Sequence, residues 1–596
     1  MTSSAILARL SRYFRNIIVG DFEYGQDHNG RPEPRCFVGR DLLNGSVEKR
    51  WLHQTDPGRC PFPTDSKSLW IFYYSSGDLQ CMRRCGWPVP VKVLDIFAEF
   101  HCLANDGERR GLSLLDAAHY FGLESIGKAA KDTGRELAIR GGPYSQSEQI
   151  ELLNYCLSDV NLETEVFLKV LEFRFTDNNS TDYLYILQAI NRGRYFKASA
   201  MMEHVGIPIK RERFQAYRAA RPTIIRSLVR EYDPGQEIWD DKLQFHNDRF
   251  LNWLNRSAIP WSLYPSGFPV LADEYFKAQA ELFPKLAPIM LLRSALKAIP
   301  NRKEDLQIGE DGFARCVLSA FRTKTGRTHP RASHFIFGRS LWERQEFLGP
   351  PPGFALAYVD YEAQELGVLA ALSGDKDFRT AYLTGDLHLT TAKNLGWIPR
   401  DGTKANHPRE RAAAKVVNFA IIYGSGPIGL ASKISPKFPP ASASALIQAH
   451  RQVYPTAHEW LDNQIRAAYW HGYVETCLGW RMRVNDNTRI NTLRNWSIQA
   501  TAGEITREAV CRMVEAGLQV CCPVHDAVLI IAPDDRIEQD AAVAVKIMQD
   551  TAFTVLGFPL LVGKPEIVRY PDTLRGEKTS HITAIVDPYL EVEEEM

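Results

Sequence analysis

The chain has 596 residues, with 71 basic and 71 acidic side chains and no formal net charge, so its charge balance argues neither for nor against a nucleic-acid partner. Its length suits roughly two to four domains, and 45% hydrophobic and 24% charged residues are typical of a soluble globular protein. No apolar run approaches the roughly 20 residues that span a bilayer, and eleven cysteines without a C-x-x-C pair argue against a zinc site or a disulfide framework. We therefore expect a cytoplasmic protein with no signal or transmembrane segment and no membrane partner.

The N-terminal residues, MTSSAILARLSRYFRNIIVGD, are rich in Ser and Arg and contain no acid before Asp21. This pattern resembles a transit peptide, but residues 17–23 read better as the first strand of a domain. Strand-like runs at 16–19, 69–74 and 91–96 alternate with helical runs. The pattern predicts an α/β domain over residues 17–160.

This region carries a set of acidic residues. Asp21 and Glu23 lie two apart in a predicted strand, so both face one side of it. Asp78 follows another strand, and Tyr155 and Asp159 lie four apart on a predicted helix. Four carboxylates and a tyrosine on such a sheet could hold two metal ions and orient a water molecule. The alternative is ordinary surface acid on helices.

Residues 181–300 are mostly helical in pattern and include a basic segment. Between residues 191 and 230 there are ten Lys or Arg and two Glu, and residues 321–344 are basic again. Such segments can follow a phosphate backbone, or they can form the solvated face of a helix. The acidic end of the chain, LEVEEEM, predicts a frayed tail.

Two aspartates lie at the ends of apolar runs in the C-terminal half. Asp360 ends the predicted strand 354–361, and Asp526 lies at the tip of a hairpin predicted over 520–533. A carboxylate among apolar neighbours is costly unless it is paired or bound to metal. Two that converge could hold two cations about 3.5–4 Å apart, the arrangement that serves phosphoryl transfer. Taken singly, each is more typical of a turn or a cap.

The stretch RAAAKVVNFAIIYGSG predicts a helix, within a region that reads as helical from 376 to 470. Arg411, Lys415, Phe419 and Tyr423 recur every four residues, and each lies only roughly 40° around the helix from the last. Glycines end the helix, as at a left-handed cap. The basic end could bind phosphates and the aromatic end could stack on a base, which suits a nucleoside triphosphate. The alternative is a core helix with snorkelling basic residues.

Taken together, these stretches resemble family A DNA polymerases that carry a proofreading exonuclease domain, in the layout of the large fragment of bacterial DNA polymerase I and in the style of phage replicases. The resemblance covers nearly the whole chain. Its main motifs are VDYEAQELGVLAALSGD at 359–375, RAAAKVVNFAIIYG at 411–424 and PVHDAVL at 523–529. Lesser motifs occur in the same order: TKTGRTHP at 323–330, TGDLHLTTAK at 384–393, ETCLGWRMRV at 475–484 and WSIQATAGEI at 496–505.

The resemblance implies roles for the polymerase residues. Asp360 and Asp526 would bind two Mg²⁺ ions, for which Mn²⁺ can substitute. Arg411, Lys415 and His388 would hold the triphosphate, with Lys415 placed to protonate the departing pyrophosphate.

Further roles concern the nucleoside and the DNA. Phe419 would stack on the incoming nucleotide, Tyr423 would close the insertion site against the template, and Glu365 would leave no room for a 2′ hydroxyl. Three residues would contact the primer-template: Arg327, Gln499 and His525. In the N-terminal domain Asp21, Glu23, Asp78 and Asp159 match exonuclease metal ligands, and Tyr155 matches the residue that orients the attacking water.

The sequence also departs from the family pattern. Ala527 replaces the Glu of the usual His-Asp-Glu motif, and Gly367 stands where Arg is usual. SHFIFG at 333–338 replaces an Asn-rich template contact, and SSGD lacks the Asn that usually precedes the aspartate at 78.

We therefore predict an α/β multidomain protein: an RNase-H-like 3′–5′ exonuclease domain (1–180) followed by a right-hand polymerase domain (181–596). Within the latter, 181–310 would be mostly thumb, 311–385 and 475–596 palm, and 386–474 fingers. The predicted function is DNA-templated DNA synthesis from dNTPs on primer-template DNA, with proofreading, in the replication of a phage or related element. A processivity factor or helicase is a further candidate partner. The alternatives are a repair-type polymerase or nuclease of low processivity and a decayed polymerase that only binds primer-template.

Overall fold

The structure, a computed structural model of the chain, describes residues 2–106, 111–124, 128–175, 179–240, 242–434, 438–573 and 579–590. It divides into two compact units. The first comprises residues 1–206, 317–330 and 357–567, and the second comprises residues 207–316, 331–356 and 568–596. This division does not test the predicted exonuclease, thumb, palm and fingers boundaries, which stay predictions. Residues 591–596 of the predicted acidic tail lie outside the described residues.

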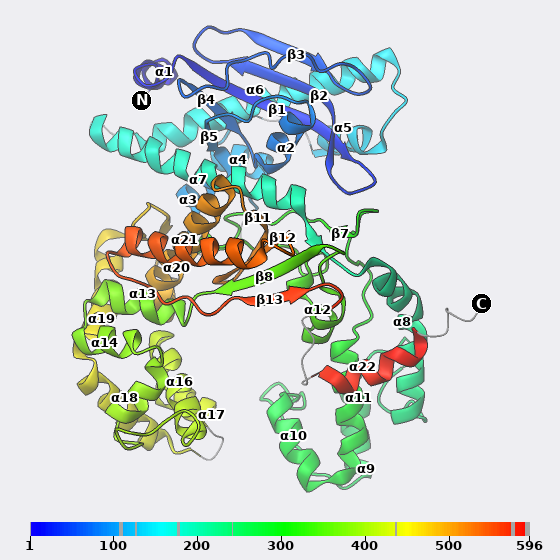
Figure 1. Cartoon of the computed structure of the whole chain (residues 1–596), viewed down its shortest axis with the longest axis vertical. Coiled ribbons are helices and arrows are strands. Elements are labelled where there is room, and N and C mark those ends of the chain that lie inside the picture. Colours follow the sequence, from blue (N-terminus) through cyan, green and yellow to red (C-terminus); the bar gives the residue numbers. More distant parts are fainter. Residues whose placement is uncertain are drawn as a thin grey trace. The chain divides into compact units, whose positions relative to one another are not determined.

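A mixed sheet near the N-terminus has the strand order β3-β2-β1-β4-β5 (Figure 1). Its strands are β1 Asn16–Gln26, β2 Pro32–Asp41, β3 Val47–Trp51, β4 Ser68–Phe72 and β5 Lys92–Asp95. β1 runs antiparallel to β2 and parallel to β4. Consecutive β-branched residues, Ile17, Ile18 and Val19, are fully buried in β1. The strands predicted at 16–19, 69–74 and 91–96 are confirmed as β1, β4 and β5.

Helices accompany this sheet along the chain. They are α1 Ser3–Leu10, α2 Ser76–Arg84, α3 Ile96–Ala104, α4 Leu114–Tyr120, α5 Lys128–Arg140, α6 Gln146–Arg174 and α7 Asn179–Val205. α6 begins at a capping box, in which Ser145 and Glu148 each bond the other's backbone N–H. α6 packs against β1 and β2, and α7 packs against β5 and α2. α6 therefore brings its polar residues next to those of β1.

A second sheet has the strand order β11-β12-β8-β13. Its strands are β8 Phe354–Asp360, β11 Gln519–Val524, β12 Ala527–Pro533 and β13 Glu566–Arg569. β11 and β12 form the predicted hairpin, with Val524 paired to Ala527 across a two-residue turn. The helices of this part are α13 Gln364–Ser373, α20 Ile490–Glu515 and α21 Ile537–Leu556, and a small two-stranded sheet joins β9 Tyr473–Glu475 to β10 Arg481–Arg483.

The predicted helical region 376–470 is confirmed. Its helices are α14 Lys376–Leu383, α15 Leu387–Asn394, α16 Pro408–Ile422, α17 Pro427–Ile434, α18 Pro440–Val453 and α19 Pro455–His471. Proline stands in the first turn of α16, α18 and α19, where its missing N–H costs no helical bond. Val417, Ala420 and Ile421 of α16 pack on residues of α17 and α18. The apolar side of α16 thus packs in this core, and its polar residues lie on the other side of the helix.

The second unit is mostly helical, as the pattern over 181–300 predicts. Its helices are α8 Arg211–Tyr232, α9 Asn247–Arg256, α10 Asp273–Leu282, α11 Ala287–Ala298, α12 Leu341–Phe347 and α22 Ser580–Val586, with 3₁₀ turns at Pro284–Leu286, Ile336–Gly338 and Asp587–Tyr589. The short strands β6 Ile207–Pro208 and β7 Phe313–Ala314 pair with each other. Phe214, Tyr217, Trp342 and Phe347 form a buried aromatic cluster.

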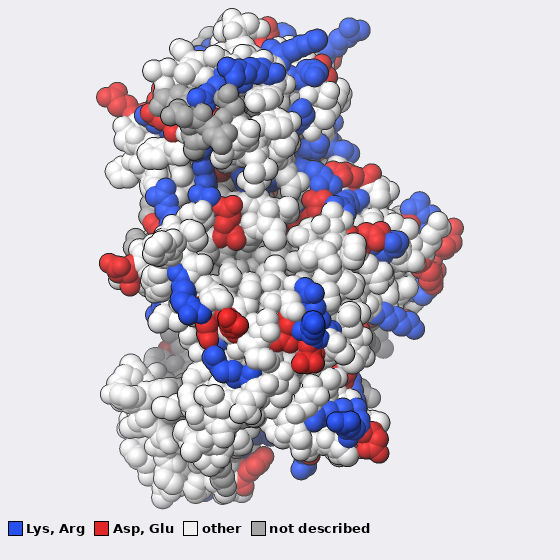
Figure 2. Space-filling model, turned by 90° about the vertical axis from the view of Figure 1, so that its left-hand side faces the viewer, with Lys and Arg blue, Asp and Glu red and all other residues white. Residues whose placement is uncertain are grey.

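Several arginines of the two basic segments form ion pairs with acidic side chains. Arg192 is buried and donates to both carboxylate oxygens of Glu99, at 2.6 and 2.8 Å. Further pairs are Arg194 with Glu508 and Glu515, Arg213 with Glu346 and Asp587, Arg221 with Asp305, Arg331 with Glu304, and Arg339 with Asp305 and Glu343. Most of these pairs join segments that are far apart in the sequence, whereas Arg339 and Glu343 lie four residues apart on one stretch of chain. Basic and acidic side chains are interspersed over the face in Figure 2.

Among the residues that the structure describes, no helix combines the length and the apolar character needed to cross a membrane.

Candidate functional site

The aspartates predicted to converge lie at one end of the second sheet. Asp360 is the last residue of β8, and Asp526 lies in the turn between β11 and β12. Because β12 is the neighbour of β8, the turn and the strand end meet. Both aspartates line one cavity of about 560 Å³. His525, the other turn residue, has φ +59° and is exposed.

The pKa of each carboxylate is raised above its ordinary value. Desolvation by neighbouring protein raises the pKa of Asp360 to about 7, and the charge of Asp526 contributes to this rise. Burial also raises the pKa of Asp526, while Arg327 opposes the rise. Two carboxylates with disfavoured charge, open to one cavity, are the oxygen ligands that a hard divalent cation prefers.

The exposed side of α16 brings two cations to the same cavity. Arg411 and Lys415 line it, and Arg411 Nε donates to Asp386 Oδ2 at 2.6 Å. Burial alone would raise the pKa of Asp386, but the hydrogen bonds from Arg411 and from the Leu389 N–H, together with the charge of Arg411, outweigh it, and the net pKa lies below the ordinary value. Arg411 is thereby held in place at the start of the helix. Lys404, from the loop before α16, is a further cation in the lining.

Two rings complete this lining. Phe419 and His388 both border the cavity, with their ring centroids 5.9 Å apart. Burial lowers the pKa of His388 to about 4, and the charges of Arg411 and Lys415 contribute to the fall. His388 is therefore neutral near pH 7. Arg411, Lys415 and Phe419 therefore border one cavity, while Val417, Ala420 and Ile421 on the other side of α16 pack in an apolar core.

Tyr423, at the end of α16, belongs to a hydrogen-bonded network. Its hydroxyl donates to Glu365 Oε2 at 2.7 Å and accepts from Gln499 Nε2 at 3.2 Å. Arg327 donates to the other oxygen of Glu365 at 3.1 Å. Burial raises the pKa of Tyr423 to about 12, and the contact with Glu365 adds to the rise. The four residues predicted to face the nucleotide sugar and the DNA are thus in direct contact.

Tyr423 also borders a second cavity, of about 460 Å³. Gln499 and Asn495 of α20 line this cavity, together with Arg489 and Lys324. Gly424, directly after Tyr423, has φ +67°, and a Cβ there would lie 2.6 Å from Asn491 Oδ1. Glycine is therefore required where the chain leaves α16 beside this cavity.

One departure from the family pattern has a physical reason. A Cβ at Gly367 would lie 2.5 Å from Cζ of Tyr382, so the tyrosine ring fills the space of a larger side chain. The Tyr382 hydroxyl donates to the carbonyl of Glu362 at 3.0 Å and accepts from the backbone N–H of Leu561 at 3.0 Å. Tyr382 thus fastens two backbone segments that line the first cavity. A second departure, Ala527, is fully buried at the start of β12.

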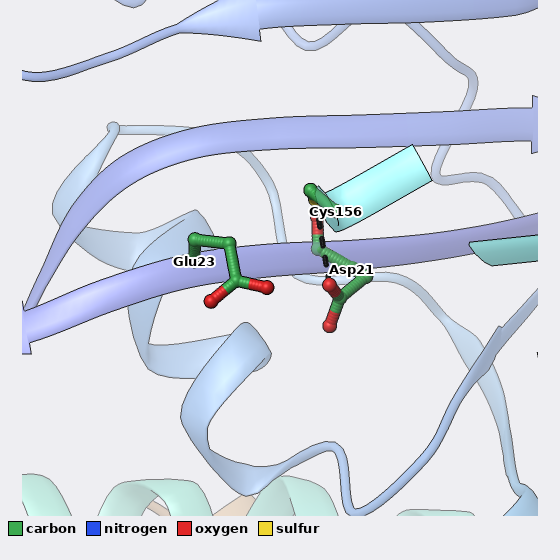
Figure 3. Close-up of side chains that lie close together, drawn as sticks. All are labelled: Asp21, Glu23 and Cys156. Atoms are coloured by element: carbon green, nitrogen blue, oxygen red, sulfur yellow. Dashed lines mark hydrogen bonds between the residues drawn. The ribbon is translucent and has the colours of Figure 1, made fainter. Parts of the chain in front are cut away.

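A second acidic cluster lies on β1 (Figure 3). Asp21 and Glu23 point their carboxylates to the same side of the strand, and Cys156 of α6 lies next to Asp21. Potential ligand atoms of the three residues all lie within 4.8 Å of one another. The thiol of Cys156 contacts Asp21 at two oxygens, the carbonyl at 3.2 Å and Oδ2 at 3.4 Å.

The other predicted members surround this cluster. Asp78 is buried in the first turn of α2, and its Oδ1 accepts from the N–H of Phe22, which lies between Asp21 and Glu23. Burial raises the pKa of Asp78 and of Glu23 well above the ordinary values, and Asp21 raises both further. The charge of Asp159 also raises the pKa of Glu23. The pKa of Tyr155 is raised mainly by burial and further by the charge of Asp159. The four predicted acids are therefore close enough to affect one another's pKa values.

Sequence reasoning missed several residues of these sites. Asp386, which holds Arg411, is two positions before His388, and its place at the N-cap of α15 could have identified it. Cys156 adjoins Tyr155 and lies one helical turn before Asp159. Lys404 and Tyr382 gave no signal, because their places in the cavity depend on contacts between distant segments.

Comparisons with known proteins agree with this geometry. The model for DNA polymerase family A matches residues 334–564, a segment that contains every predicted polymerase-site residue except Arg327. DNA polymerase I, thermostable, of Thermus thermophilus is 33% identical over 211 residues, which are 33% of this chain and 25% of that protein. The DNA polymerase of Mycobacterium phage D29 is 32% identical over 232 residues, which are 38% of this chain and 36% of the phage protein. The matched region thus spans only about a quarter to a third of the length of these relatives.

The fold has a counterpart among solved structures. The chain is similar to the POL domain of Pol1 from M. smegmatis, determined in complex with DNA primer-template and dNTP, with a TM-score of 0.68 and 16% identity. The likeness covers 95% of this chain and 97% of that chain, and at this identity it is a likeness of fold. The chain thus has a mixed α/β fold similar to that of this polymerase domain, and its residues 334–564 match DNA polymerase family A.

Proposed function

We propose that this protein is a DNA-templated DNA polymerase that extends the 3′ end of a primer with dNTPs. One observation carries the proposal: a single cavity of about 560 Å³ is lined by Asp360 and Asp526 together with Arg411, Lys415 and Phe419. A metal-bound nucleoside triphosphate requires carboxylates that bind the metal ions, basic side chains that bind the phosphates and an aromatic ring that stacks on the base.

In this assignment Arg411, Lys415 and His388 bind the triphosphate, and Lys404 is a further cation within the same lining. Lys415 stands on the exposed side of α16 and is the residue to protonate the departing pyrophosphate. Phe419, one turn further along α16, stacks on the incoming nucleotide. The order along the helix thus follows the order of phosphates, sugar and base.

The polymerase site fits divalent metal ions. Asp360 and Asp526 offer carboxylate oxygens to one cavity, and the raised pKa of both shows that their charge lacks compensation in the protein alone. Two Mg²⁺ ions, or Mn²⁺ in their place, would stabilise the charge on the attacking 3′ oxygen and on the leaving pyrophosphate. The residues of the chain position the reactants: the aspartates from the sheet and the cations from α16.

Selection of the sugar and grip on the DNA fall to the Tyr423 network. Glu365, held by Tyr423 and Arg327, excludes a 2′ hydroxyl, and Tyr423 closes the insertion site against the template. Arg327 and Gln499 contact the minor groove of the primer-template, and His525 contacts the primer end.

A second activity, 3′–5′ exonuclease, is favoured by the cluster on β1. Asp21, Glu23, Asp78 and Asp159 would hold two metal ions, and Tyr155 would orient the attacking water. The support is the mutual effect of these groups on their pKa values and their place at one locus. Residues 1–180 would form the RNase-H-like exonuclease domain, with the thumb, palm and fingers following as the sequence predicts.

The proposed role is replication of a phage or related element, with a processivity factor or helicase as a candidate partner. A repair-type polymerase or nuclease of low processivity is the main alternative, and a decayed polymerase that only binds primer-template is another. Primer extension on primed single-stranded DNA, with and without dNTPs, tests the two proposed activities against the decayed form. Extension with dNTPs and shortening without them support the proposal, and stable binding without either product supports the decayed form.

A further inference from the structure

A chain of polar side chains runs from the first cavity into the helical region behind it. It connects His388 of α15, Asn418 of α16, His450 of α18 and His458 of α19. Each link measures between 3.0 and 3.1 Å. All four side chains are buried, with between 1% and 6% of their surface exposed. Four helices therefore each contribute one member to a single connected path.

The direction of these bonds follows from the chemistry of the groups. Asn418 Nδ2 can only donate, so Nδ1 of His388 accepts its bond. Asn418 Oδ1 can only accept, so Nε2 of His450 donates to it. Nδ1 of His450 then accepts from Nε2 of His458. Of the three rings, His450 is hydrogen-bonded through both nitrogens, whereas His388 contributes Nδ1 and His458 contributes Nε2 to the path.

The rings stay neutral, which this order requires. Burial lowers the pKa of His450 to about 3 and that of His458 to about 4. With Nδ1 of His388 accepting, its single proton lies on Nε2, the ring nitrogen left for the cavity. Thr391 accepts the second N–H of Asn418 at 3.1 Å, so both N–H groups of the amide have an acceptor.

We propose that Asn418, His450 and His458 are positioning residues that hold His388 in the Nε2–H tautomer, so that it presents a hydrogen-bond donor to the triphosphate of a bound dNTP. This inference rests on the proposed function, because it deepens the role of His388 there. With the reverse order, Nε2 would direct a lone pair at phosphate oxygens, which repels. The path therefore determines whether the ring attracts or repels the substrate.

The test compares variants at His450, whose link to Asn418 lies outside the cavity. His450→Leu removes the donor to Asn418, and His450→Gln restores one. Leu446→Ala, one turn earlier on α18 and in the apolar core of the same helices, is the matched control for loosened packing. His458→Leu serves as a second variant should His450→Leu not fold.

Two measurements are made on the full chain with Mg²⁺. The first is steady-state extension, which gives KM for dTTP and kcat separately. The second is the shift in melting temperature with added dTTP, which reports nucleotide binding even without turnover. We expect His450→Leu to raise KM about tenfold, the usual effect of losing one hydrogen bond to a charged group, with kcat near the parent value. His450→Gln should recover most of this loss, and His458→Leu should show a smaller rise.

The decisive comparison uses His388→Ala. If the path acts through His388, then His450→Leu adds less than about twofold to KM in the His388→Ala background, because coupled residues are not additive. Full additivity, or an equal rise in Leu446→Ala, would overturn the inference and leave the path a structural network. If the parent protein binds dTTP and extends the primer, and His450→Leu has the same KM for dTTP, the inference is wrong and the proposed function stands. A parent that neither binds dTTP nor extends overturns the proposed function as well.

Discussion

The contact between Glu365 and Tyr423 makes sugar selection a quantitative test. The Glu365 carboxylate is held at both oxygens, by the Tyr423 hydroxyl at 2.7 Å and by Arg327 at 3.1 Å. A 2′ hydroxyl that needs this space obliges the carboxylate to give up at least one of these bonds. Glu365→Ala removes the obstacle and both bonds, so the variant should accept ribonucleotides.

The structure also sets the size of the effect. A hydrogen bond to a charged group contributes about 1.5–3 kcal/mol. Giving up one such bond corresponds to a preference for dNTP of roughly 10- to 150-fold. We expect Glu365→Ala to reduce the ratio of kcat/KM for dTTP to that for the ribonucleotide rTTP by about this factor. Single-nucleotide extension of a labelled primer over a range of nucleotide concentrations measures the ratio.

A matched control is Glu362→Ala. Glu362 is an exposed carboxylate three residues before Glu365 that lines the first cavity, and the structure gives it no hydrogen bond to Tyr423. Its removal should leave the ratio unchanged even if the overall rate falls. A parental ratio in Glu365→Ala would refute the reasoning, and it would mean that Glu365 only ties Tyr423 to Arg327.

Asp21→Ala combined with Glu23→Ala should abolish primer shortening in the absence of dNTPs and leave extension nearly intact, and a parallel loss of both activities on gel assays would contradict two separate sites. Asp526→Ala should reduce the extension rate by several orders of magnitude, as expected when one metal ligand of a two-metal site is removed, and near-normal extension would exclude the assignment. Phe419→Tyr should lower discrimination against ddTTP roughly ten- to a hundredfold. A dideoxynucleotide has no 3′ hydroxyl and loses the hydrogen bond that this group makes, and the tyrosine hydroxyl can supply it instead. An unchanged ratio of kcat/KM for dTTP to kcat/KM for ddTTP would count against a ring that faces the sugar. Finally, the folded-state pKa of Asp360 is about 7 against an ordinary value of 3.8, so metal-free stability should fall as pH rises between these values. Asp360→Asn should therefore melt at a higher temperature than the parent at pH 8, by a margin that narrows toward pH 4, and an equal Tm at pH 8 would contradict the raised pKa.

The local sequence determined those elements whose pattern repeats over a short distance. The four-residue spacing from Arg411 to Tyr423 predicted both the helix and its polar stripe, because each turn of an α-helix returns side chains to the same face. Apolar runs on either side of Val524-His525-Asp526 predicted the hairpin, and alternation in β1 placed Asp21 and Glu23 on one side. These features depend on neighbours within a few residues, so the sequence alone was sufficient for them.

The resemblance to family A extended the prediction from local elements to residues far apart in the chain. It assigned Asp360 and Asp526 to one pair of metal ions, and it placed Glu365 and Tyr423 beside the same incoming nucleotide. The structure agrees for both pairs, which share a cavity and a hydrogen bond of 2.7 Å respectively. Neither spacing nor composition could have paired them, since a sheet order and a helix packing bring them together.

Only the tertiary structure decided which partners the remaining groups find. Arg192 belongs to a segment that reads as a basic patch, yet it is buried against Glu99, 93 residues earlier. Cys156 contacts Asp21 from another element, Tyr382 fills the space left by Gly367, and His450 continues a path that begins at His388. The physical reason is the same in each case. A buried polar group must find a partner, and the fold, rather than the neighbouring sequence, determines which distant group is within hydrogen-bonding distance.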